Sequence, residues 1–119
     1  MQTVFVHEAR ATIAPGGDDG APGAAITAAL CGHWEHEPPC PLAPHHTSAE
    51  RTGDVLHLRT LFVVEPELED TVRQRIDSAL AGERLIGRND IVTTWRLRSS
   101  RPADVRPAER THADSLLRG

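Results

Sequence analysis

The segment from Cys31 to His46 concentrates the side chains that are best suited to metal binding. It holds both cysteines and four of the seven histidines of the 119-residue chain. Thiolate and imidazole are the ligands that borderline-soft ions such as Zn²⁺ prefer, and four of them can close a tetrahedral shell. The density of these residue types therefore predicts one transition-metal site, with Zn²⁺ as the first choice of ion and Cu⁺ as the second.

Spacing within this segment selects the ligands. On a helical turn, His33 and His36 converge at positions i and i+3, and the bend at Pro38 and Pro39 can return a thiolate to the same point. The preferred ligand set is Cys31, His33, His36 and Cys40. The alternates are His45 and His46 at the end of the segment and, where the segment crosses the sheet, His7 and His57. Two other interpretations stay open, namely solvated loop histidines and a redox pair of the two cysteines.

The number of protein ligands decides what such a site can do. Four ligands close the shell and make the ion structural, whereas three leave a position for water or substrate. In the second case the protein is a small metalloenzyme of undetermined reaction, and Glu35 is the candidate catalytic residue because a carboxylate near the ion can act as a general base. A third possibility is a metal-free interaction module that forms a homodimer through its exposed sheet or an edge strand.

Composition excludes several other classes of function. The chain contains no lysine, which removes the lysine P-loop and Schiff-base chemistry. A formal net charge of −4 argues against a nucleic-acid partner, because such binders gain affinity by neutralising phosphates. No apolar run is long enough to span a bilayer, and the first residues lack a signal-peptide pattern. We therefore expect a cytoplasmic protein with no membrane partner, in which the cysteines are thiols or metal ligands.

The elements that must position these residues follow from periodicity and turn signals. Strands are expected at residues 3–14, 46–50, 55–64 and 91–98, and helices at residues 24–30 and 67–81. This order predicts an α+β domain over residues 1–98, of the ferredoxin-like β-α-β-β-α-β type, with two helices on one face of an antiparallel sheet and the Cys/His loop at residues 31–46. Residues 99–119 are expected to form a polar tail that can hold a short helix near residues 108–117.

Alternation along the third strand assigns its side chains to the two faces of the sheet. Leu56, Leu58 and Phe62 form the better core face, so His57 and Arg59 emerge on the opposite face. The first and third strands are central neighbours in the predicted topology, and we expect His7 to lie beside His57 there. This second face is expected to take a small molecule, a second subunit or the folded-back loop.

Overall fold

The computed structural model describes residues 1–31, 43–87 and 90–118. They form an α+β fold with a curled antiparallel sheet of five strands in the order β2-β3-β1-β5-β4. The main elements are β1 (Thr3–Ile13), α1 (Ala21–Cys31), β2 (His45–Thr52), β3 (Val55–Val64), α2 (Glu69–Ala81), β4 (Arg84–Ile86), β5 (Val92–Ala103) and α3 (Arg110–Arg118). Short 3₁₀ turns at Pro66–Leu68 (η1) and Pro107–Glu109 (η2) lead into α2 and α3.

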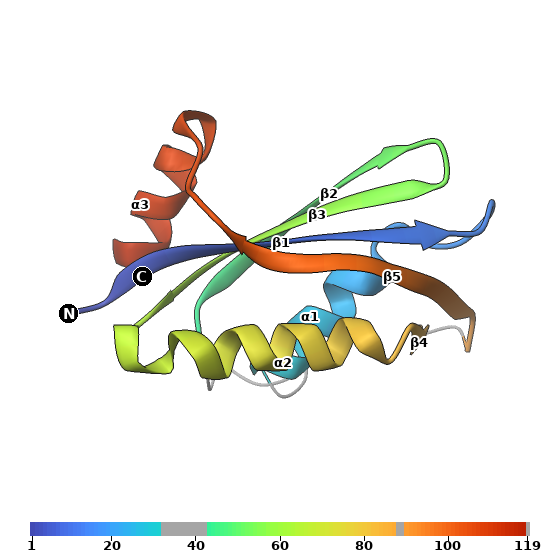
Figure 1. Cartoon of the computed structure of the whole chain (residues 1–119), viewed down its shortest axis with the longest axis horizontal. Helices are drawn as coiled ribbons and strands as arrows, with labels where there is room; N and C mark the ends of the chain where they lie inside the picture. Colours follow the sequence, from blue (N-terminus) through green and yellow to red (C-terminus); the bar gives the residue numbers. More distant parts are fainter. Residues whose placement is uncertain (32–42, 88–89, 119) are drawn as a thin grey trace.

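The helices lie on both sides of the sheet. In Figure 1, α1 and α2 run along one face and α3 stands against the other. The predicted adjacency of the first and third strands is confirmed, because β1 pairs with β3. The element order differs from the predicted β-α-β-β-α-β series, since β4 precedes the last strand and α3 follows it. No helix among the described residues is long and apolar enough to cross a membrane.

The predicted elements are present, with shifted boundaries. Helix α1 begins three residues before the predicted start, because Pro22 suits a first helical turn and an Asp18 turn precedes it. In that turn the Asp18 carboxylate accepts the Gly20 N–H at 2.9 Å, and its carbonyl accepts the Ala21 N–H at 3.0 Å. Gly53 closes the β2–β3 hairpin with φ of +64°, a conformation that favours glycine.

Helix α2 carries the apolar stripe that was predicted for residues 67–81. Val72, Ile76 and Leu80 are buried at helical spacing. The indole N–H of Trp95 on β5 donates to the Leu80 carbonyl at 2.9 Å, which fixes the end of the helix against the sheet. Strand β4 was not predicted, since three residues are too few to display an alternating pattern.

Strand β5 is longer than the predicted strand and contains a bulge. Its register against β1 shifts between Arg10 and Ala11, where Ser99 pairs with Arg10 and Leu97 pairs with Ala11. Arg98 is therefore the extra residue. The strand continues to Ala103, and the short helix that was expected near residues 108–117 is α3. Residues 99–103 thus belong to the sheet and α3 packs on it, so the expectation of a polar tail after residue 98 was wrong.

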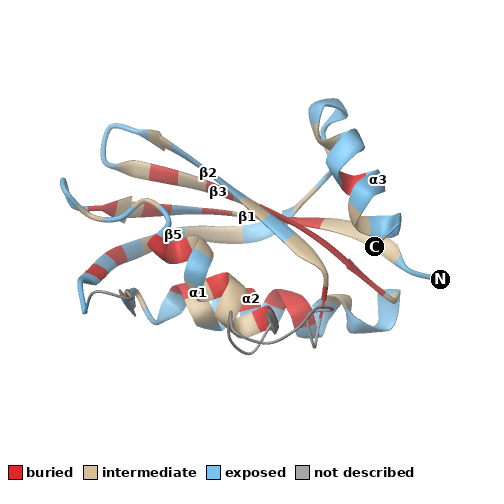
Figure 2. Ribbon diagram, turned by 180° about the vertical axis from the view of Figure 1, so that it is seen from behind, coloured by how far each residue is buried: buried red, intermediate tan, exposed pale blue. Residues whose placement is uncertain are grey.

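The core lies between the sheet and the helices α1 and α2. Figure 2 shows the buried residues concentrated there, while α3 contributes one. The main cluster includes Leu56, Leu58, Phe62, Ile76 and Leu80, so the core face predicted for the third strand is confirmed. A smaller cluster of Val6, Leu61 and Ala113 joins α3 to the opposite face.

Candidate functional site

The predicted metal ligands fall largely outside the described residues. Cys31 is the last residue of α1. The side chain of Cys31 and the whole of His33, Glu35, His36 and Cys40 are not among the residues that the structure describes. Within residues 1–31, 43–87 and 90–118, no group of three or more His, Cys, Asp or Glu side chains is arranged to hold a metal ion. The preferred ligand set thus stays a prediction.

The alternate ligands are described, and the sheet separates them. His45 and His46 open β2, and successive residues of a strand point to opposite faces. His45 lies on the α1 side, with Nε2 at 3.2 Å from Thr27 Oγ1 and Nδ1 at 3.2 Å from the Ala43 carbonyl. His46 stacks on His112 of α3 with ring centroids 3.8 Å apart. Burial lowers the pKa of both His45 and His46 below the ordinary value of 6.5.

A hollow of about 330 Å³ runs along this edge of the molecule, between α1 and β2. Gly23 and Thr27 line it from the helix, and His45, His46 and Thr47 line it from the strand. The edge therefore offers access to the start of β2 from solvent.

His7 does not lie beside His57, so that expectation was wrong. It is 3% exposed and faces α2, where its Nδ1 lies 3.0 Å from Arg73 Nη1. Its Nε2 lies 2.7 Å from Ser100 Oγ and 3.2 Å from Asp77 Oδ1. Burial lowers the pKa of His7, with the nearby Arg73 charge acting in the same direction.

These contacts fix the chemistry that His7 can perform. Because the Arg73 guanidinium can only donate, Nδ1 of a neutral His7 accepts and Nε2 carries the proton. Nε2 then donates to Ser100, whose hydroxyl donates to Asp77. A nitrogen that already holds a proton cannot take one from Ser100, so this Ser-His-Asp group is not an activated nucleophile. The Arg73 guanidinium cation lies against Nδ1 and His7 is only 3% exposed, which also argues against His7 as a metal ligand.

The prediction that His57 and Arg59 emerge on the face opposite the main core is confirmed. Both line a hollow of about 560 Å³ on the α3 side of the sheet. We call this hollow the sheet-face pocket. Its floor is built from cross-strand neighbours, since Arg59 pairs with Glu8 and Ser48, while His57 pairs with Arg10 and Glu50. Arg101 on β5 and the η2 turn complete the wall, with Arg106, Ala108 and Glu109 as lining residues.

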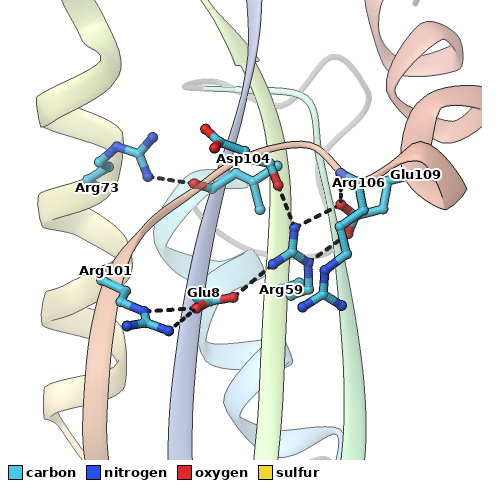
Figure 3. A network of polar contacts seen from close by, with 8 residues as sticks. Glu8, Arg59, Arg73, Arg101, Asp104, Arg106 and Glu109 are labelled. Carbon is cyan, nitrogen blue, oxygen red and sulfur yellow. Dashed lines mark hydrogen bonds and ion pairs between the residues drawn. The ribbon is translucent and has the colours of Figure 1, made fainter.

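A network of charged side chains holds α3 at the rim of this pocket (Figure 3). Arg59 donates to Glu8 Oε2, to both Glu109 carboxylate oxygens and to the Asp104 carbonyl, each at 2.8 Å. Arg101 donates to the other Glu8 oxygen at 2.8 Å from Nε. The Arg59 side chain is 11% exposed and that of Glu109 is 16% exposed. Arg59 and Glu109 are therefore largely shielded from solvent, whereas the Arg101 side chain is 70% exposed.

Hydrogen bonding shifts the ionisation of this network toward its charged form. The bond from Arg101 lowers the pKa of Glu8, and the bond from Arg59 lowers the pKa of Glu109. The bond to Glu109 raises the pKa of Arg59 in turn. Sequence reasoning missed Glu8, Glu109 and Arg101. Alternation along β1 could have predicted Glu8. Glu8 and Arg10 alternate with the small residues Ala9 and Ala11, so the two charged side chains point to the same face of the sheet.

In comparisons with known proteins, no family model, no curated protein and no solved structure matches the chain.

Proposed function

We propose that the protein binds one transition-metal ion, Zn²⁺ before Cu⁺, through Cys31, His33, His36 and Cys40, with His45 as the alternate ligand. The composition of the segment between α1 and β2 supports this proposal, because thiolate and imidazole together suit these ions. Thiolate ligands persist in a reducing compartment, so we place the protein in the cytoplasm. A ferredoxin-like core, extended by β4 and α3, is part of the same proposal.

The observation that carries the choice of His45 is its position beside α1. Its Nε2 lies 3.2 Å from Thr27 Oγ1, and Thr27 precedes Cys31 by one helical turn. The two ends of the Cys/His-rich segment therefore approach each other at this edge of the sheet. An ion that joined position 31 to the start of β2 would cross-link two elements that are already in contact.

The other alternates are less suitable for a shared site. His7 faces α2, where it contacts the Arg73 cation as well as Ser100 and Asp77. His57 lines the sheet-face pocket, on the side away from α1. His46 stacks on His112 of α3. This leaves His45 as the described histidine that faces the helix ending at Cys31.

Elemental analysis of untagged, reduced protein by inductively coupled plasma mass spectrometry tests the proposal. We expect about one equivalent of zinc or copper, lost in a His36→Ala, Cys40→Ala double variant. His45→Ala should speed the loss of metal to a chelator, whereas His46→Ala and His57→Ala serve as matched controls and should retain it.

Absence of metal after reconstitution would refute metal binding, and would favour the metal-free homodimer as the alternative. Equal loss in the His45 and His46 variants would refute the assigned orientation alone. A different result would favour the metalloenzyme with an open site. In that case the fold stays intact after chelation, and the ion in the loaded protein has only three protein ligands. Glu35 is then the residue to substitute next.

A further inference from the structure

The sheet-face pocket differs from the rest of the molecule in the sign of its charge. Four arginines and three glutamates line it, together with His57, in a chain whose formal net charge is −4. Its volume of about 560 Å³ falls within the range of small-molecule sites. The pocket thus collects positive charge on an otherwise acidic protein.

The lining charges divide into two groups. Glu8 and Glu109 are paired with Arg59 and Arg101 at 2.7 to 2.8 Å, and this network holds η2 and α3 in place. Among the ion pairs of the described residues, Arg10, Arg106 and the third glutamate of the pocket, Glu50, take no part. Figure 3 shows the Arg106 guanidinium without a drawn contact, on the same side of the sheet as Arg59. Two guanidinium groups and one carboxylate at the pocket are therefore outside these ion pairs, which leaves a net positive charge to meet a ligand.

Their neighbours complete an anion-binding surface. Arg10 pairs across the sheet with His57, whose imidazole also lines the pocket. Ser48 adds a hydroxyl group from the neighbouring strand β2. A guanidinium group presents a planar fork of donors that matches a carboxylate or a phosphate, and this pairing is stronger than a neutral hydrogen bond.

We propose that the sheet-face pocket binds a small organic anion, whose carboxylate or phosphate group is held by Arg10 and Arg106 with His57 and Ser48 beside it. This site is separate from the proposed metal site, because His57 and Arg10 face away from α1.

A small ligand fits this surface better than a second copy of the chain. The centres of homodimer interfaces are depleted in charged residues, whereas this pocket is lined mainly by them. Ala108 and Glu109 of η2 line the pocket, and α3 stands on the same face of the sheet (Figure 1), where it would obstruct a flat approach of another sheet. The polar lining instead suits a hydrated ligand that is recognised by a few directed contacts.

Titration of the ¹⁵N-labelled full chain with succinate and, separately, with inorganic phosphate tests the proposal by NMR. We expect saturable shifts at β1, β3 and η2 with at least one probe. An Arg10→Gln, Arg106→Gln double variant should bind about a hundredfold more weakly, because each lost charge-assisted contact reduces the affinity by about tenfold. The matched control is Arg75→Gln, Arg84→Gln, which removes the same charge from exposed positions on α2 and β4.

Three results would overturn the proposal: no saturable binding of either probe, shifts that map away from the pocket, or equal weakening in both double variants. A dimer that buries this face, seen by light scattering with shifts at β1 and β3 on dilution, would also overturn it. Circular dichroism checks that the variants fold.

Discussion

The two faces of the sheet are held by different kinds of interaction. On the α1 and α2 side, a continuous aliphatic core contains Leu56, Phe62, Ile76 and Leu80. On the α3 side, the buried cluster is limited to Val6, Leu61 and Ala113, and beyond it the face is charged. Apolar burial scales with area and provides most of the free energy of folding, so the first face determines whether the chain folds. The second face is available for recognition.

This contrast also separates the conditions to which each face responds. Packing of aliphatic groups is insensitive to pH and depends weakly on salt, whereas ion pairs respond to both. Beside its small apolar cluster, helix α3 is attached through the Arg59–Glu109 ion pair and a stacked histidine pair. We therefore expect α3 to loosen under conditions in which the rest of the fold persists.

The largest expected effect tests the apolar face. Ile76→Ala removes a fully buried side chain from the α2 stripe and should lower the free energy of unfolding by about 2–5 kcal/mol. Leu116→Ala on α3 is the matched variant, and it should cost about 1 kcal/mol because that side chain is only half-buried. Urea denaturation measures both. An equal loss of unfolding free energy in the two variants would show that apolar packing stabilises both faces of the sheet alike, which would contradict the proposed difference between them.

A smaller effect tests the charged attachment of α3. Glu109→Gln removes the carboxylate that accepts two bonds from Arg59, and should weaken the docking of α3 by about 1–2 kcal/mol. Hydrogen exchange of the α3 amides is the measurement, and Glu50→Gln, a pocket carboxylate outside the described ion pairs, is the control. Protection of α3 that is unchanged in Glu109→Gln would contradict a role of the network in docking.

The same network predicts a dependence on pH. The pKa of Glu109 is held below its ordinary value of 4.5, so the folded state binds fewer protons than the unfolded state. The stabilisation is fully present above pH 4.5 and is lost as pH falls through the lowered pKa. Exchange of the α3 amides should accelerate in that window before the core amides respond. In Glu109→Gln this acid response of α3 should be reduced.

The smallest expected effect concerns the stacked rings of His46 and His112. Their centroids lie 3.8 Å apart, and His112→Ala should reduce the docking of α3 by about 0.5 kcal/mol at neutral pH. The same exchange experiment measures it, with Thr111→Ala, one residue away and exposed, as the control. An effect as large as that of Glu109→Gln would mean that stacking, rather than the ion pairs, attaches the helix.

Local patterns predicted much of the fold. In the sheet-face pocket they predicted His57 and Arg59 but not the partners of Arg59. The α2 stripe and the alternation of β3 are short-range signals, and both were predicted correctly. The partners Glu109 and Arg101 lie 50 and 42 residues beyond Arg59 in the chain, and no local pattern joins them. The position of His7 was misjudged because Val4, Phe5 and Val6 are apolar on both faces. Ala9, Ala11 and Ile13 share its parity and would have assigned it to the core side.

The bulge at Arg98 has a consequence for how this sequence can change. Before it, Trp95 and Leu97 face the helices; after it, Ser100 reaches Asp77 on the helix side, while Arg101 reaches Glu8 on the other. One extra residue therefore reverses the parity of the strand. Deleting Arg98 would remove the bulge and join Leu97 directly to Ser99, which leaves Ser100 opposite Ala9 on the helix side and Arg101 opposite Glu8 on the pocket side. A one-residue deletion is therefore compatible with the fold at this position, because it turns the bulge into regular strand pairing.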